Sequence, residues 1–287
     1  MHITALPWGK RIDLDEESDL KEARRVFDSG KYGLRIGPFT EINDSFFLDR
    51  FLIHFKDISD FNFMAWGDGV SYDFLYQMTN LERLHLDVMY PIDFSKLSKL
   101  TELSLMWNKK FISNFQTLRN LEQLTISDFK EKDLSSLASL KSLTTLSFKT
   151  ASIKSLNGIE ELIHLKRLSL GGVRSLVDLT AIASLQKLKF LEIDIAWKLQ
   201  DCSPIGQLGE LEVLQLMDCK NLASIQFVRQ MPKLRQLYTL GTTMINDYDT
   251  TPAEHIPIFF GSLDKKYTKM YPEKEIREGQ RTWSSYH

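Results

Sequence analysis

One pattern of hydrophobic positions, Leu-x-x-Leu-x-Leu, recurs along most of the chain. It is found as LERLHL, LTELSL, LEQLTI, LTTLSF, LKRLSL, LKFLEI and LEVLQL, which begin at Leu81, Leu100, Leu121, Leu143, Leu165, Leu188 and Leu211. LRQLYT from Leu234 keeps two of the three anchors, and ISDFNF from Ile58 is a weaker copy with phenylalanines in the leucine positions. From Leu81 onward, successive copies begin 19 to 23 residues apart. Because a nearly constant period of this length is the signature of a repeat architecture, the chain is predicted to be a solenoid of stacked units.

Within each unit the spacing of the hydrophobic residues changes. Leu84 and Leu86 are two positions apart, which places both on one face of a short strand and His85 on the other. Between Ile153 and Leu165 hydrophobic residues recur at every third position, which is the period of a 3₁₀ turn. Each unit is therefore predicted to be a strand, a tight corner and a short helical return.

A second regularity marks the start of the helical returns. The position ten residues before each later strand motif holds Asp133, Ser155, Asp178, Asp201 and Ser224. Oxygen atoms of Asp and Ser side chains accept hydrogen bonds from the unpaired N–H groups of a first helical turn. These residues are predicted to cap the returns.

The motif and its spacing resemble the leucine-rich-repeat family, specifically the 22-residue class of bacterial internalins and of a regulatory subunit of type-1 protein phosphatase. The resemblance covers about residues 58–241. It implies an α/β fold, a curved horseshoe-shaped solenoid with a parallel sheet on its concave side and short 3₁₀ or helical returns on its convex side. The family usually places Asn three residues after the last strand anchor. The corresponding residues here are Met89, Asn108, Phe129, Ala151, Val173, Ala196, Cys219 and Thr242. Only Asn108 matches, so the corners must satisfy their backbone groups in another way.

The two ends are predicted to close the solenoid, because a stack of repeats exposes apolar faces at its first and last unit. Residues 1–57 are predicted to be an N-terminal cap with one degenerate coil. They contain a helix within 13–30, a strand from Tyr32, and helical spacing from Phe47 to Phe55 after the candidate cap Asp44. Residues 58–241 form the repeats, and 242–287 form a C-terminal cap, with the apolar run 256–263 over the last coil, followed by a polar tail.

Composition and charge exclude several classes of binding partner. The chain is 43% hydrophobic and 26% charged, with a formal net charge of −2. This balance gives no general attraction to nucleic acid or to an anionic membrane. Two cysteines fit a reducing compartment. The sequence shows no apolar run typical of a signal peptide or of a membrane span, so a cytoplasmic location is predicted.

The sequence offers no chemistry-bearing motif. None of its six histidines has a partner at the spacing of metal ligands, and the phosphate-binding, nucleophile-elbow and dinucleotide-binding motifs are missing. Cys202 and Cys219 fall at positions expected in the core. We therefore predict that the chain is not an enzyme and binds neither a cofactor nor a metal ion.

The residues expected to face away from the core form two candidate protein-binding groups. The first lies in the earlier repeats and consists of Trp66, Arg83, His85, Asp87, Tyr90, Trp107, Asp128 and Phe129. The second lies in the later repeats and consists of Glu192, Asp194, Met217, Asp218 and Tyr238. Aromatic residues and Met beside Arg are typical of interface anchors. As an alternative, Trp66, Tyr90 and Phe129 fold inward to fill corners that lack Asn, whereas Trp107 is expected to face outward.

Acidic residues outnumber Lys and Arg at the predicted concave positions. A nucleic-acid binder shows the opposite imbalance. The prediction is a protein–protein interaction module, acting as an inhibitor, an immunity-type neutraliser or a scaffold, whose partner is a folded protein with a basic patch and neither nucleic acid nor membrane. The alternative is an enzyme or small-ligand binder with its site in the N-terminal cap or C-terminal tail.

Overall fold

The computed structural model describes residues 1–6, 9–30, 32–37, 40–42, 45–67, 70–261 and 264–268. The chain divides into two compact units, Met1–Thr125 and Ile126–His287. We call them the N-terminal unit and the C-terminal unit. Strand β9 (Gln123–Ser127) contains residues of both.

The N-terminal unit is built on a mostly parallel sheet. Its strands are β1 (His2–Leu6), β2 (Gly9–Leu14), β3 (Gly33–Ile36), β4 (Asp60–Phe63), β5 (Arg83–Asp87) and β7 (Glu102–Met106), in that order in the sheet. Strands β1 and β2 pair antiparallel, and the pairs from β2 to β7 are parallel. Two short strands, β6 (Ile92–Asp93) and β8 (Ile112–Ser113), pair separately. The helical returns are α1 (Leu20–Asp28), α2 (Ser45–Phe55), η1 (Asp73–Gln77), η2 (Phe94–Lys96) and η3 (Phe115–Thr117).

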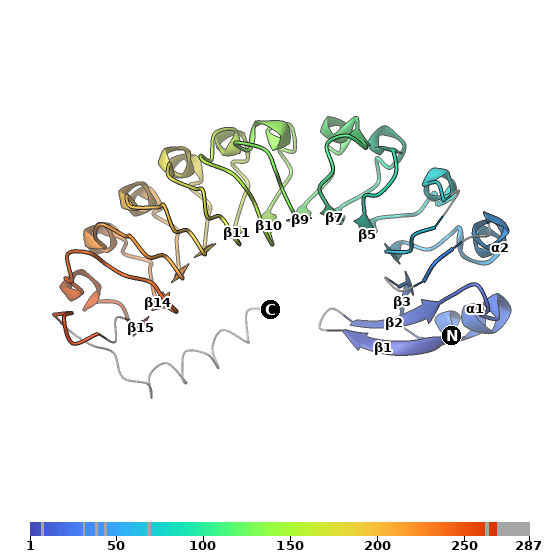
Figure 1. Cartoon of the computed structure of the whole chain (residues 1–287), viewed down its shortest axis with the longest axis horizontal. Helices are drawn as coiled ribbons and strands as arrows, with labels where there is room; N and C mark the ends of the chain where they lie inside the picture. The colour runs from blue at the N-terminus through green and yellow to red at the C-terminus, as the bar shows by residue number, and fades with distance from the viewer. Residues whose placement is uncertain are drawn as a thin grey trace. The chain divides into compact units, whose positions relative to one another are not determined.

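The C-terminal unit repeats one parallel coil. Its strands are β10 (Thr145–Phe148), β11 (Arg167–Leu170), β12 (Phe190–Asp194), β13 (Val213–Met217), β14 (Gln236–Leu240) and β15 (Ile258–Gly261). The 3₁₀ returns are η4 (Ser135–Leu137), η5 (Ile159–Glu161), η6 (Thr180–Ser184), η7 (Ser203–Gln207), η8 (Gln226–Gln230) and η9 (Thr251–Ala253). In each unit, taken by itself, the strands of the sheet line one side and the helical returns line the other (Figure 1).

The predicted repeat is confirmed by the register of the strands. Leu146 of β10 pairs with Leu168 of β11, and Leu168 pairs with Leu191 of β12. All three side chains are fully buried. Because successive side chains of a strand point to opposite faces, the residues between these anchors turn away from the core. We call the surface that these residues form in each unit the free face of its sheet.

Four of the five predicted caps are found, and the exception is Ser155, because the return η5 begins after Gly158, which is described without a side-chain cap. The carboxylates of Asp133, Asp178 and Asp201 each accept a hydrogen bond from the backbone N–H two residues later, at 3.0, 2.8 and 2.8 Å. The Ser224 hydroxyl does the same for Gln226 at 3.1 Å. Short polar side chains thus hold the first turn of these returns.

The N-terminal end contains more structure than predicted. The expected helix is α1, whose first turn is capped by Asp19, and the expected strand from Tyr32 is β3. The aromatic run after it is α2, in which Phe51 and Phe55 are buried with ring centroids 5.1 Å apart. Its expected cap, Asp44, lies outside the described residues. The hairpin β1–β2 is a finding of the structure that the hydrophobic pattern did not indicate.

At the other end the segment 256–263 does more than cover the last coil. It contains β15, which pairs with β14 as one further parallel strand. Residues 269–287 lie outside the described part, so the polar tail stays a prediction. Among the described residues, no helix has both the length and the apolar character needed to cross a membrane.

Other side chains take the place of the Asn at the corners. The Tyr72 hydroxyl donates to the Asp87 carbonyl and accepts the Met89 N–H at 3.0 Å. The Thr243 hydroxyl donates to the Leu216 carbonyl at 2.8 Å and accepts the Cys219 N–H at 3.0 Å. A hydroxyl both donates and accepts, so it can satisfy a carbonyl and an N–H at once.

Candidate functional site

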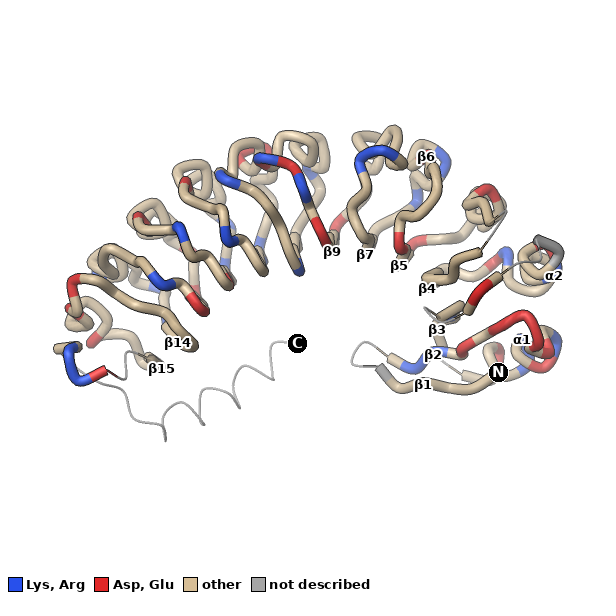
Figure 2. Tube along the Cα trace, viewed as in Figure 1, with Lys and Arg blue, Asp and Glu red and all other residues tan. Residues whose placement is uncertain are grey.

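The charges on the free face of the N-terminal unit are paired with one another. Arg11 forms an ion pair with Asp60, and the second oxygen of Asp60 lies 3.3 Å from Nε of Arg83. Arg35 pairs in the same way with Asp13. Both signs of charge occur in this part of the unit (Figure 2), with Arg11 and Asp13 on β2, Arg35 on β3, Asp60 on β4, and Arg83 and Asp87 on β5. These side chains neutralise one another within the unit, which leaves little net charge to attract a partner.

Strand β5 brings together three of the predicted binding residues. Arg83, His85 and Asp87 occupy its alternate positions, with Arg83 exposed and the other two half-buried. Trp66 is 42% exposed. Tyr90 is half-buried, and its hydroxyl donates to the Gly67 carbonyl at 2.7 Å and accepts the Gly67 N–H at 3.2 Å. Tyr90 therefore fills a corner, as the alternative for it predicted.

The outward orientation predicted for Trp107 is wrong. Its side chain is 8% exposed, and its ring stands edge-on to Phe115 with the centroids 5.3 Å apart. The reason is that Trp107 lies two residues after Leu105 and so continues the buried face of Leu103 and Leu105, as the equivalent Val88 does after Leu86. The indole turns back and packs on η3.

Phe129 also faces inward, which corrects its place among the binding residues. It is fully buried in the position where the family has Asn, and its ring packs against Phe148 at 5.1 Å. The preceding residue, Asp128, adopts a left-handed backbone with φ of 57°, and its N–H donates to the Thr150 hydroxyl at 2.9 Å. Its carboxylate pairs with Lys130 at 2.7 Å. The contacts of this corner therefore stabilise the fold. The carboxylate of half-buried Asp128 is already paired with Lys130.

The free face of the C-terminal unit carries an apolar cluster. Its members are Phe190, Val213, Tyr238 and Phe260, each no more than 5% exposed, with Met217, Leu240 and Ile258 packed against them and partly exposed. We call these seven residues the free-face cluster. Tyr238 and Phe260 have ring centroids 5.4 Å apart, and the Tyr238 hydroxyl donates to Gln236 at 2.9 Å.

The exposure expected for Tyr238 is therefore wrong, although the face on which it lies was predicted correctly. Tyr238 is 4% exposed because β15 adds a neighbouring strand, which places Phe260 directly beside it. The last repeat motif of the sequence corresponds to β14, so the sequence did not predict a strand that covers Tyr238. The partly exposed Met217 and Leu240 pair across β13 and β14 and offer the accessible part of the cluster.

Acidic residues border the free-face cluster. Glu192 and Asp194 of β12 pair in register with Gln215 and Met217 of β13. Burial raises the pKa of Asp194, and the negative charges of Asp218 and Glu192 raise it further. None of the outward positions of β12, β13 and β14, all of which the structure describes, holds Lys or Arg. The outward positions of these three strands therefore carry net negative charge, and Arg167 of the neighbouring strand β11 interacts electrostatically with Glu192.

Two residues at the border of the cluster have partners already. The Asp218 carboxylate accepts the N–H of Thr242 at 2.7 Å and its hydroxyl at 2.9 Å. Asp218 thus caps a corner while keeping its charge near the surface. On β11, the guanidinium of Arg167 lies 4.1 Å from the centroid of the Phe190 ring, a distance typical of a cation–π contact. Burial lowers the pKa of Arg167.

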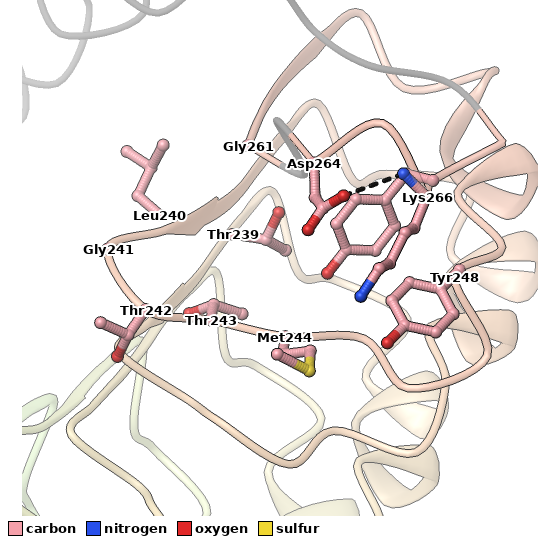
Figure 3. A pocket seen from close by; sticks show the side chains of 11 residues that line it. Thr239, Leu240, Gly241, Thr242, Thr243, Met244, Tyr248, Gly261, Asp264 and Lys266 are labelled. Atoms are coloured by element: carbon pink, nitrogen blue, oxygen red, sulfur yellow. Dashed lines mark hydrogen bonds between the residues drawn. The ribbon is translucent and has the colours of Figure 1, made fainter.

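A pocket of about 380 Å³ opens beside the free-face cluster, where β14 and β15 end (Figure 3). It is lined by Thr239, Leu240, Gly241, Thr242, Thr243, Met244, Tyr248, Gly261, Asp264, Lys266 and Tyr267. Leu240 belongs to both the pocket and the cluster. The hydrophobic pattern does not indicate this pocket, because several of its lining residues follow the last repeat motif and carry no periodic signal.

The described residues contain no group of three His, Cys, Asp or Glu side chains that could hold a metal ion. Both cysteines are buried free thiols in the C-terminal unit, and burial raises the pKa of Cys219 to about 12 and that of Cys202 as well. The Cys219 thiol donates to the carbonyls of Met217 and Ile193, at 3.4 and 3.6 Å. It acts as a packed corner residue.

Comparison with solved structures gives neighbours of the same architecture. An internalin (inlF) from Listeria monocytogenes is 19% identical, with a TM-score of 0.59 over 76% of this chain and 63% of that one. An internalin C2 (inlC2) from the same species is 22% identical, with a TM-score of 0.52 over 66% of this chain and 83% of that one. TLR13, in its complex with ssRNA13, is 18% identical, with a TM-score of 0.53 over 73% of this chain and 33% of that one.

The chain thus spans less than two thirds of the first internalin and one third of TLR13. No protein-family model matches the sequence, and neither does any curated protein. At these identities the likeness concerns the fold alone. Together with the repeated strand, corner and 3₁₀ return of both units, it shows that the chain has a leucine-rich-repeat fold.

Proposed function

We propose that this chain is a protein–protein interaction module that holds a folded partner on the free face of its C-terminal unit. The observation that carries the proposal is the free-face cluster with its accessible Met217 and Leu240, bordered by Glu192 and Asp194. Apolar anchors surrounded by polar residues are the usual composition of a binding hot spot. The acids of β12 favour a partner with a basic patch, because charge complementarity speeds association and fixes register.

The N-terminal unit contributes a second candidate surface. Trp66 and Met106 are each 42% exposed, and Arg83, His85 and Asp87 form a polar row on β5. We assign this surface a secondary role because its charges pair internally. Binding to it is expected to be weaker and more tolerant of substitution.

The acidic character of the C-terminal free face argues against nucleic acid as the ligand. TLR13 was solved with ssRNA13, so RNA is the relevant comparison ligand for this fold. Binding to phosphates requires clustered Lys and Arg and weakens steeply with salt. We expect no saturable binding of single-stranded RNA to this chain, measured by fluorescence anisotropy at about 0.15 M salt. The same proposal includes the role of the module. It acts in the cytoplasm as an inhibitor, a neutraliser or a scaffold.

Affinity capture with three baits tests the proposal. The baits are the full chain, the double variant Glu192→Lys with Asp194→Lys, and the control Glu254→Lys, which reverses an exposed charge just after η9. A protein that is recovered with the full chain and the control but lost with the double variant supports the proposal. Binding of the purified pair, measured by calorimetry, is expected to weaken at least about tenfold in the double variant.

Equal recovery by all three baits would place the binding surface elsewhere. Unfolding is excluded as a cause if the double variant keeps the melting temperature of the control. Capture that depends on Trp66→Ala and not on the double variant would move the principal surface to the N-terminal unit.

A further inference from the structure

The pocket beside the free-face cluster has two aromatic walls. The rings of Tyr248 and Tyr267 have centroids 5.5 Å apart and planes inclined by 59°. Tyr267 is buried, and its hydroxyl accepts the N–H of Ile245 at 3.0 Å, which fixes the ring. Tyr248 is half-buried and exposes part of its ring. The pocket therefore presents a preformed aromatic surface and not a loose hollow.

The Tyr248 ring already holds a cation. The ammonium of Lys266 lies 5.7 Å from its centroid, within the range of a cation–π contact. Lys266 is exposed and stands on a flexible stem, so its ammonium can return to water when another group takes its place. The chain's own lysine thus indicates which kind of group this wall accepts.

One carboxylate lines the same pocket, and a second is bonded to its lining. Asp264 is exposed on one wall, where Oδ1 accepts the backbone N–H of Lys266 at 3.0 Å and leaves the second oxygen available (Figure 3). A second carboxylate, that of Asp218, accepts the N–H of the lining residue Thr242 at 2.7 Å. Burial raises the pKa of Tyr267, and the nearby charges of Asp264 and Asp247 add to the effect, in keeping with a negative potential around the ring.

We propose that this pocket binds an arginine or lysine side chain of a protein partner. The cationic group replaces the Lys266 ammonium over the Tyr248 ring and pairs with Asp264, while apolar neighbours in the partner pack on Leu240 of the free-face cluster. An arginine suits the site best, because a planar guanidinium stacks on an aromatic ring and binds a carboxylate through two N–H groups. That the side chain belongs to a partner protein rests on the proposed function, whereas the preference of the pocket for a cation does not.

Three small probes test the preference of the pocket on the intact chain. They are N-acetyl-arginine methylamide, the citrulline analogue, which has nearly the same shape without the charge, and N-acetyl-glutamate methylamide. Binding is followed by the amide chemical shifts of Tyr248, Gly261 and Tyr267. The arginine probe is expected to bind saturably and at least tenfold more tightly than either other probe.

Substitutions in the pocket lining measure how much each side chain contributes to binding of the arginine probe. Tyr248→Leu and Asp264→Asn should each weaken the arginine probe several-fold. Lys266→Met should tighten it several-fold, because the competing ammonium is gone, whereas Lys265→Met, next to it and outside the pocket lining, should change nothing. Melting temperatures within about 2 °C of the parent protein show that the variants are folded.

Equal binding of the citrulline probe, preference for the glutamate probe, or weaker arginine binding in Lys266→Met would each overturn the proposal. The two proposals fail separately. If the arginine probe binds but no partner depends on Glu192 and Asp194, the proposed function fails and the cation site stands. If a partner depends on those acids but the probe does not bind, only the cation site is wrong.

Discussion

Replacing Trp107 by alanine removes a large side chain from the interior of the N-terminal unit. The indole is 8% exposed and stands edge-on to Phe115, which in turn lies edge-on to Phe94 at 5.1 Å. Truncation of a buried Trp costs about 3–5 kcal/mol, and an edge-to-face pair accounts for about 0.5–1.5 kcal/mol of such a loss. Because the residue sits at the end of β7, where a corner can relax, we expect a loss of about 3 kcal/mol in the free energy of unfolding.

Urea denaturation followed by far-UV circular dichroism measures this loss. Stacked repeats unfold with interactions mainly between neighbours, so transitions recorded with two probes must coincide before a free energy is extracted. Trp107→Phe should recover more than half of the stability, since it keeps an aromatic edge on Phe115. The control is Met106→Ala, one residue earlier and 42% exposed, which should stay within about 0.5 kcal/mol of the parent protein. A loss below about 0.5 kcal/mol for Trp107→Ala would show that the indole belongs to the surface, and would refute its placement in the core.

Three further substitutions test the C-terminal unit. Leu168→Ala leaves a cavity at a fully buried anchor of β11 and should cost about 2–5 kcal/mol in urea denaturation, whereas Ser169→Ala on the free face should cost less than about 0.5 kcal/mol. Gly241→Ala puts a Cβ about 2.4 Å from the Asp218 carboxylate at a φ of 67° and should cost about 1–2 kcal/mol for the backbone alone, while Gly209→Ala, whose Cβ meets nothing, should be nearly neutral. Asp194→Asn should stabilise the chain at pH 7. The raised pKa of Asp194 means that its ionised form opposes folding above that pKa, so the gain should vanish as the pH falls below the ordinary aspartate pKa, and a gain that persists at low pH would contradict this account.

The repeated core could be predicted because one physical rule generates it. Leu168 is buried for the same reason as Leu146 and Leu191, since alternate residues of stacked strands share a face. The caps Asp133 and Asp201 follow from the needs of a helical turn and require no knowledge of the neighbours. Features that follow from the repeat or from the hydrogen bonds of one short segment could therefore be predicted from the sequence.

The ends and corners depend on contacts between segments that carry no periodic signal. The strand β15 became evident only in the structure, because its residues Phe259 and Phe260 follow one another and hide the alternation of faces. Because β15 shields Tyr238 from solvent, the exposure predicted for Tyr238 was wrong. At Phe129 an aromatic ring fills space at a corner where the family has an Asn, whereas Trp107 continues the buried face of Leu103 and Leu105 past the end of β7. A pattern of hydrophobic positions records polarity and not the volume that is left to fill.

The acids of the candidate surface differ in how far they are already bonded within the chain. The Asp218 carboxylate accepts hydrogen bonds from the N–H and the hydroxyl of Thr242. Its removal should therefore destabilise this corner as well as weaken any contact with a partner. Glu192 and Asp194 lie on β12, whose outward positions hold no Lys or Arg, and burial together with the charges of Asp218 and Glu192 raises the pKa of Asp194. A cation from a partner would lower that pKa toward the ordinary value and so strengthen the complex as the pH rises through the raised pKa. Affinity that is constant across that pH range would mean that Asp194 does not meet a cation in the complex.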